Sequence, residues 1–308
     1  MNSEAKALDT SMADQDLYGY GPNPPHAKWP NGARVAVSLV LNIEEGSEFA
    51  ISKGDTRNER VYDMTQEPLD IPDPAMESHF AYGARAGYWR VLRVLDKYGV
   101  TCTLNLCGQA LEKTPWVGED GLKRGFEIGC HGYRWDTPAG KNEDEERSWI
   151  QQSVESIRRV TGVRPVGWHS RAPYTLATRR LLIEEGGFIY DSDLYDDDLP
   201  RILNVGDRRH VVVPYSLDTN DMRCQRPESP FVRAKDFSDY VNDGFDWLWE
   251  EGETSPKMMT IGLHTRIIGR PARINGLEAV LRHMTEKGKV WFATREQIAR
   301  HWLQLSKA

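Results

Sequence analysis

Short apolar runs that alternate with longer amphipathic segments constrain the fold of this chain more than any other feature. Strands that alternate with helices form parallel sheets, because each helical crossover returns the chain to the same edge. The strand-like runs are Val35–Leu41, Thr101–Leu106, Phe126–Cys130, Val163–Trp168, Phe188–Tyr190, Val211–Val213, Met258–Leu263 and Val290–Phe292. The helical segments are Ala84–Tyr98, Glu143–Val160, Leu176–Glu185, Phe237–Glu250, Gly276–Lys287 and Arg295–Leu303.

This many repeats of one unit favour a closed or nearly closed barrel over an open sheet. We therefore predict an α/β fold, a distorted (β/α) barrel of about seven parallel strands in a single domain. The polar, aperiodic residues 1–16 predict a flexible N-terminal arm, and residues 17–308 the barrel domain. Thr294 and Gln297 have the spacing of a capping box, which predicts the start of the last helix.

Composition argues against several classes of function. The net charge of −7, with Lys and Arg interspersed, is not that of a dedicated nucleic-acid binder. No run approaches the roughly 18 apolar residues of a membrane span, and residues 1–16 lack the apolar core of a secretory signal. The four cysteines have no CxxC spacing, so we expect reduced thiols. We expect a cytoplasmic protein with a small-molecule partner and no nucleic-acid or membrane partner.

Polar side chains follow four of the predicted strands. Active sites of barrels are built where strands end, so these side chains are expected to face one pocket. An acid–base set with a nearby cation suits hydrolysis of an amide or ester. The chain has no GxGxxG loop, no phosphate-binding loop and no GxSxG elbow, which argues against dinucleotide, phosphoryl-transfer and serine-hydrolase chemistry. The strand-end residues are Asn42, Glu44, Glu45, His131, His169, Arg171, His264 and Arg266.

These positions resemble the motifs of the polysaccharide-deacetylase superfamily, which are an acidic pair, HxxxH, RxPY and a late LxH. NIEEG, HGYRW, RAPY and GLH occupy those places in the same order. Other segments, such as YDSDLYDDDLP, VPYSLDTNDMR and IGLHTRIIGRPAR, resemble the metal-independent allantoinase and cyclic imide hydrolase branch. The likeness spans about Tyr18 to Trp302. It implies a deacetylase-like barrel, hydrolysis of a cyclic amide, and a homotetramer.

Two departures from the deacetylase motifs bear on cofactor and substrate. Deacetylases bind a divalent ion through the second acid and both histidines, but Trp135 stands where the second histidine is expected. A stable zinc site needs three protein ligands, so we predict no cofactor, with weak metal binding through Glu45 and His131 as an alternative. The RAPY segment is closer to deacetylases than to allantoinases. The ring, whether allantoin, a hydantoin or a succinimide, therefore stays open.

The resemblance also suggests catalytic roles. Glu44 matches the deacetylase base, and a pKa raised by burial and by a second carboxylate would suit that task. Glu45 and His131 would orient the water or the N–H groups of the substrate. His264 would protonate the departing ring nitrogen.

The remaining strand-end residues are predicted to bind substrate. Arg171 would stabilise charge on the carbonyl oxygen or be held by an acid, with Asp193 as the candidate partner. Trp135 would form a flat wall against a small ring, or belong to the core. Asn42, His169 and Arg266 complete the predicted substrate-binding set. The polar insertion over residues 52–78 is either a lid or a surface excursion.

Two other functions remain open from the sequence. One is an N-deacetylase acting on acetylated amino sugars, chitin or peptidoglycan, with or without a divalent metal. The other is a non-catalytic barrel that binds a small ligand.

Overall fold

A single sheet organises the computed structural model, which describes residues 17–61, 69–225 and 231–306. The strand order is β6-β7-β5-β4-β3-β2-β1-β8, and β9 pairs with the first residues of β1. The predicted arm over residues 1–16 lies outside the described residues. The strands are β1 Val35–Ile43, β2 Thr103–Leu106, β3 Glu127–Cys130, β4 Gly167–Trp168, β5 Tyr190–Asp191, β6 Arg201–Val205, β7 Arg208–Val212, β8 Lys257–His264 and β9 Val290–Phe292.

Parallel pairing joins all of these strands except β6, which runs antiparallel to β7 as a hairpin. The α/β fold prediction is confirmed as a half-barrel. Irregular chain, rather than a strand ladder, bridges the side between β7 and β8. There the Met258 amide donates to the Asp198 carbonyl at 2.9 Å, and the Gly262 amide donates to the Thr219 carbonyl at 3.2 Å.

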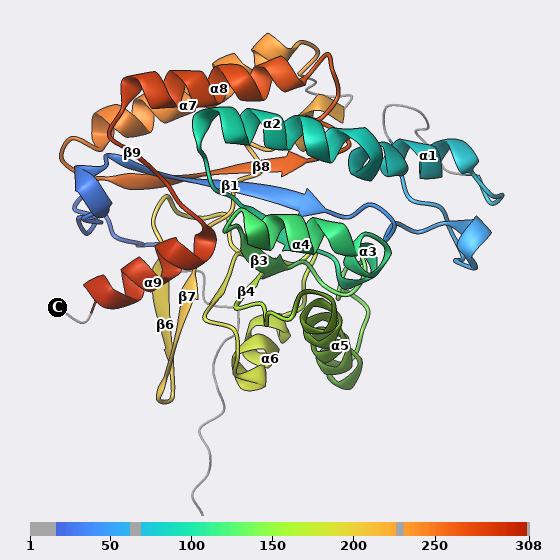
Figure 1. Cartoon of the computed structure of the whole chain (residues 1–308). Helices are drawn as coiled ribbons and strands as arrows, with labels where there is room; N and C mark the ends of the chain where they lie inside the picture. Colours follow the sequence, from blue (N-terminus) through green and yellow to red (C-terminus); the bar gives the residue numbers. More distant parts are fainter. Residues whose placement is uncertain (1–16, 62–68, 226–230, 307–308) are drawn as a thin grey trace, which may run out of the picture.

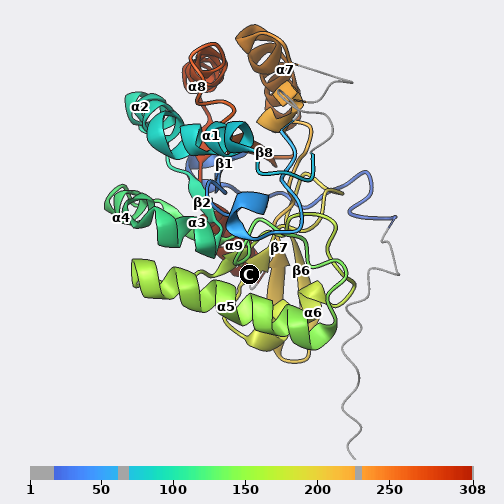
Figure 2. The ribbon, with the colours of Figure 1, turned by 90° about the vertical axis from the view of Figure 1, so that its right-hand side faces the viewer.

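Helices cover the outside of the sheet. Figure 1 shows α2, α7 and α8 over β1 and β8, with α3 to α6 around the opposite side. Figure 2 shows helices above, to the left of and below the strands. Every residue of β1 is buried, as expected for a parallel strand covered on both faces. The helices are α1 Pro74–Tyr82, α2 Tyr88–Tyr98, α3 Gly108–Lys113, α4 Pro115–Lys123, α5 Glu143–Thr161, α6 Thr178–Glu185, α7 Ala234–Glu251, α8 Ile274–Lys287 and α9 Arg295–Leu305.

The helix boundaries follow local sequence signals where those signals are strong. Thr294 accepts from the Gln297 amide, and the Gln297 side chain accepts from the Thr294 amide, so the predicted capping box is confirmed. The structure also contains α1, α3, α4 and β6, which the sequence analysis missed. Helices α3 and α4 are short and interrupted by Pro115, and β6 has little buried surface, so none has a clear periodicity.

The predicted insertion over residues 52–78 ends in α1, which continues through a π-helical turn, Gly83–Gly87, into α2. All four cysteines are buried, and no disulfide joins any two of them. None of the helices within the described ranges combines the length and apolarity that a bilayer crossing demands.

Candidate active site

A cavity of about 260 Å³ opens where β1, β3, β4 and β8 end. Its size is near the lower end of the range for small-molecule pockets. Most of the predicted site residues line it together. They are Asn42, Glu44, His131, Trp135, His169, Arg171, His264 and Arg266. The insertion also reaches the cavity, through Glu59, Arg60 and Val61.

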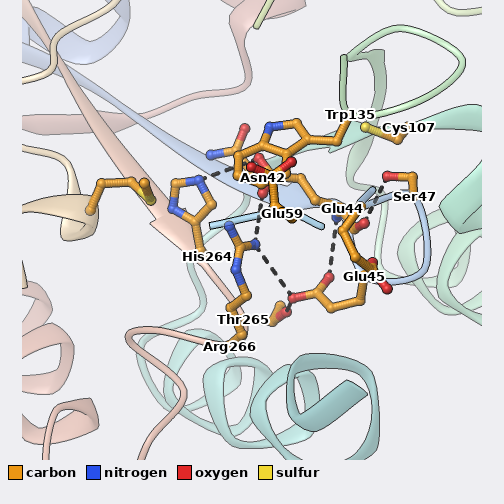
Figure 3. A network of polar contacts seen from close by, with 12 residues as sticks. Asn42, Glu44, Glu45, Ser47, Glu59, Cys107, Trp135, His264, Thr265 and Arg266 are labelled. Carbon is orange, nitrogen blue, oxygen red and sulfur yellow. Dashed lines mark hydrogen bonds and ion pairs between the residues drawn. The ribbon is translucent and has the colours of Figure 1, made fainter. Parts of the chain in front are cut away.

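A tight turn after β1 sends the two adjacent glutamates in different directions. The Glu44 carbonyl accepts from the amide of Ser47 at 2.9 Å and from its hydroxyl at 2.7 Å. Gly46 has a φ of 94°, which glycine adopts without strain. Glu44 therefore faces the cavity, whereas Glu45 does not line it. Instead, the Glu45 carboxylate accepts from the Thr265 hydroxyl (Figure 3).

Close packing against the π-helical turn fixes the position of Glu45. A Cβ atom on Gly83 would lie 2.0 Å from the Glu45 Oε1 atom, so only glycine leaves room for this carboxylate. The predicted role of Glu45 in orienting water stays a prediction, but its side chain is separated from the cavity.

Three cationic or titratable groups surround the Glu44 carboxylate, of which His264 and Arg266 are seen in Figure 3. Its Oε1 lies 3.4 Å from Nε2 of His131 and 3.4 Å from Nε2 of His264. Its Oε2 lies 2.7 Å from Nη1 of Arg266. These last two atoms do not meet the angular criteria of a hydrogen bond, so the contact is an ion pair.

Opposing effects separate the pKa values of the two glutamates. Burial would raise the pKa of Glu44, but Arg266, His264 and His131 outweigh it and lower the pKa well below its usual value. The prediction of a raised pKa for Glu44 is therefore wrong. It is Glu45 whose pKa is raised, because burial outweighs the effect of Arg266 and of the Thr265 hydroxyl.

Asp221 holds His264 from the side opposite Glu44. Its carboxylate lies 2.6 Å from Nδ1 of His264 and accepts from the His264 amide at 2.8 Å and the Ile268 amide at 3.1 Å. Burial would lower the pKa of His264, but the carboxylates of Glu44 and Asp221 raise it to about 9. The imidazole is thus a cation at neutral pH. Asp221 was not among the predicted site residues, because it lies in a 3₁₀ turn rather than at a strand end.

Backbone carbonyls set the tautomers of two further histidines. Nδ1 of His131 lies 2.6 Å from the His169 carbonyl, and Nδ1 of His169 lies 3.2 Å from the Ser192 carbonyl. A carbonyl only accepts hydrogen bonds, so each Nδ1 carries the proton. In the neutral ring, Nε2 then has a lone pair. Each histidine follows one strand and is held by the chain following the next strand, β4 or β5.

Arg171 is paired with Glu59 rather than with Asp193. The guanidinium makes two contacts with the Glu59 carboxylate, at 2.8 and 2.9 Å, and lies 3.8 Å from the centroid of the Trp135 ring. Asp193 instead accepts from the amide and hydroxyl of Ser170, both at 2.7 Å, and does not line the cavity. The prediction that Asp193 neutralises Arg171 is therefore wrong, because the insertion supplies the partner.

The Asn42 side chain lines the cavity, but it makes its hydrogen bonds to other protein groups. Its amide nitrogen donates to the Leu263 carbonyl at 3.2 Å and to the Tyr215 hydroxyl at 3.5 Å, while its oxygen accepts from Asn105 at 2.9 Å. Asn42 thus positions neighbouring groups. Tyr215 was not among the predicted site residues either, and its ring lies against the His169 ring with centroids 4.2 Å apart.

Comparison with known proteins places the chain in a family. The model of the polysaccharide deacetylase family matches residues 71–186. A Schizosaccharomyces pombe protein named "Putative polysaccharide deacetylase" is 36% identical, over 94% of this chain and 96% of the relative. The chain belongs to the polysaccharide deacetylase family. The predicted superfamily is thereby confirmed.

Two crystal structures share both fold and sequence with this polysaccharide deacetylase family member. A probable polysaccharide deacetylase from Pseudomonas aeruginosa PAO1 is 44% identical with a TM-score of 0.90, and covers 94% of this chain and 98% of its own. PuuE allantoinase is 42% identical with a TM-score of 0.90, and covers 94% of this chain and 96% of its own. The chain is thus about equally similar to a probable polysaccharide deacetylase and to an allantoinase.

The residues at the metal-binding positions of the deacetylase motifs do not fit a metal ion in this family member. Glu45 is turned away from the cavity, and the indole of Trp135 cannot act as a ligand. The Arg266 guanidinium, only 2.7 Å from Glu44, would repel a cation there. Across the described ranges, no three His, Cys, Asp or Glu side chains are grouped so that they could hold a metal ion.

Proposed function

We propose that this family member hydrolyses the C–N bond of a small cyclic amide, a ureide or an imide, without a catalytic metal. The observation that carries the proposal is the Glu44 carboxylate, enclosed by two imidazole Nε2 atoms and one guanidinium. This arrangement supplies a base, an acid and a fixed positive charge from side chains alone.

Glu44 is the general base. Its lowered pKa keeps it ionised at neutral pH, and Arg266 occupies Oε2 and leaves Oε1 for water. Nε2 of His131 lies 3.4 Å from the same Oε1, as does Nε2 of His264. A water molecule that donates a hydrogen bond to Oε1 therefore lies beside both imidazoles, next to the base that takes its proton.

His264 is the general acid. When water attacks, one of its protons goes to Glu44, and the carbonyl becomes a tetrahedral oxyanion. The C–N bond then breaks as the His264 Nε2–H donates its proton to the leaving ring nitrogen. The product carboxylic acid gives its proton to solvent and becomes a carboxylate, while the released nitrogen group stays on the same, now open, molecule. Glu44 then passes the proton that it took on to His264, whose Nε2 lies 3.4 Å from Oε1, and both side chains are restored. Asp221 keeps the acid charged and oriented.

Arg266 provides the positive charge that a metal would otherwise supply. The side chain is 2% exposed and lies with its guanidinium carbon 4.5 Å from the Phe80 ring centroid and 5.0 Å from that of Trp135. A buried, fixed cation stabilises developing negative charge more than a solvated one, because little reorganisation is needed.

The likeness to PuuE allantoinase supports cyclic-amide hydrolysis, and the small cavity suits a ring better than a sugar chain. The alternative is N-deacetylation, which the family model and the Schizosaccharomyces pombe relative favour. A homotetramer and a cytoplasmic location, both expected from the sequence, remain proposals.

The test is an assay of chelator-treated protein, shown metal-free by elemental analysis, on cyclic ureides, cyclic imides and N-acetylated sugars. We expect ring opening by the metal-free protein and no gain on adding zinc. Release of acetate from a sugar, or activity that returns only with a divalent ion, would replace the proposal by the deacetylase alternative.

A further inference from the structure

His169 presents an unused hydrogen-bond acceptor to the cavity. Its Nδ1 lies 3.2 Å from the Ser192 carbonyl and 3.4 Å from the Asp193 carboxylate, and both of these groups only accept. Nδ1 is therefore the donor, and the lone pair of the neutral ring is on Nε2. Among the residues that the structure describes, none contacts this Nε2 through a hydrogen bond or ion pair.

The surroundings of His169 keep the ring neutral and fixed. Burial lowers its pKa, against the opposing effect of Asp193. The ring is stacked between those of His131, with centroids 5.3 Å apart and planes within 3°, and Tyr215, with centroids 4.2 Å apart. Because stacking on both faces and the Nδ1 contacts restrict rotation, Nε2 cannot turn away to find another partner.

A fixed acceptor without a partner selects ligands that donate a hydrogen at that point, since a ligand lacking the donor leaves the lone pair unsatisfied. The proposed reaction already engages the amide that is opened through Glu44, His131 and His264. His169 follows β4, one strand beyond His131, and so faces a different part of the ligand.

We propose that His169 accepts a hydrogen bond from a second N–H of the substrate, which makes cyclic ureides better substrates than cyclic imides. This inference rests on the proposed function. A hydantoin-type ring has one N–H in the amide that is opened and another outside it. A succinimide-type ring has only the N–H in the opened amide.

The experiment compares kcat/KM for hydantoin, for hydantoin methylated on the nitrogen outside the opened bond, and for succinimide. For the wild-type protein we expect methylation of that nitrogen to lower kcat/KM by about 10- to 100-fold, because a donor is lost opposite a fixed acceptor. Succinimide should be disfavoured against hydantoin to a similar extent.

Two variants separate hydrogen bonding from shape. His169→Phe keeps a ring between its two neighbours but has no nitrogen, and His169→Asn keeps a donor near the Nδ1 position but has nothing at Nε2. In both, with folding verified by circular dichroism, the methylation effect should shrink to less than about threefold. A penalty that persists in the Phe variant is steric, and it would overturn the role of His169.

The same measurements distinguish failure of the His169 role from failure of the proposed function. If the wild-type protein opens all three rings with similar kcat/KM, His169 does not select a second N–H, although cyclic-amide hydrolysis stands. If it opens none of them, nor any other ring of the larger panel, the proposed function itself is wrong.

Discussion

Two buried polar clusters in the same half-barrel differ in how completely their groups are paired. The first, here called the core network, consists of Glu127, Arg179, Tyr190, Asp191 and His210. Asp191 contacts Arg179 at 2.8 and 3.1 Å and His210 at 2.8 Å, and Glu127 accepts from Tyr190 at 2.6 Å. Each charged group therefore has a protein partner.

The second, here called the cavity cluster, consists of Glu44, His131, His169, His264 and Arg266. It contains similar charged and titratable side chains, but its hydrogen-bonding groups are paired less completely within the protein. His131 and His169 each satisfy Nδ1 with a carbonyl and turn Nε2 to the cavity, and Glu44 shares one oxygen between two imidazoles at 3.4 Å. Buried polar groups that are fully hydrogen-bonded within the protein stabilise the fold, whereas groups that keep a hydrogen-bonding position toward the cavity can bind a ligand or act on it. The contrast predicts different consequences for similar substitutions.

The largest effect is expected for Glu44→Gln. We expect kcat for ring opening to fall by about 10³-fold or more, because the amide cannot take a proton from water. The variant should still fold, since Gln keeps the volume of the side chain and an amide oxygen that can face Arg266. Steady-state kinetics and circular dichroism measure both effects.

Glu45→Gln is the matched control for Glu44→Gln. It changes the same atoms one residue away, but in a side chain that does not line the cavity. A loss of kcat in Glu45→Gln as great as that in Glu44→Gln would contradict the assignment of the base.

The next largest effect is expected for Asp191→Asn in the core network. Removing the charge leaves buried Arg179 without its carboxylate, which should cost about 3–5 kcal/mol in the free energy of unfolding. Urea unfolding measures this loss. The kcat of the folded fraction should stay within about threefold of wild type. A stable Asp191→Asn protein with collapsed kcat would remove the distinction between the two clusters.

A smaller effect is expected for Asp221→Asn. His264 acts as an acid in its protonated form, so activity should be lost as pH rises through about 9. Without the Asp221 charge the pKa of His264 falls, and the alkaline limb of kcat should move down by about one unit or more. The acid limb, which depends on Glu44, should move little. A pH profile with an unchanged alkaline limb would show that His264 is not the acid.

The sequence predicts the fold well because its strongest signal, alternating strands and helices, is also what determines a parallel half-barrel. It predicts the short elements poorly. Strands β4 and β5 contain only two residues each and are shorter than the predicted runs Val163–Trp168 and Phe188–Tyr190, because two residues are too few for any period to set their bounds.

The candidate site is predictable where it depends on strand ends and unpredictable where it depends on irregular chain. His131, His169 and His264 meet in one cavity because each follows a parallel strand. Asp221 and Glu59 come from a 3₁₀ turn and an insertion, whose paths no pattern encodes. The pKa of Glu44 also depended on three-dimensional contacts, since Arg266 reverses the effect of burial.

The histidine tautomers have a consequence for how such a pocket can diverge. Main-chain carbonyls accept the Nδ1 protons of His131 and His169, so the tautomer of each ring does not depend on which side chain the residue with the carbonyl carries. Side chains around the two rings can therefore change without exchanging the donor and acceptor nitrogens of either ring. A new ligand preference then requires only the exchange of one ring at one strand end, so the scaffold can acquire new substrates in single genetic steps.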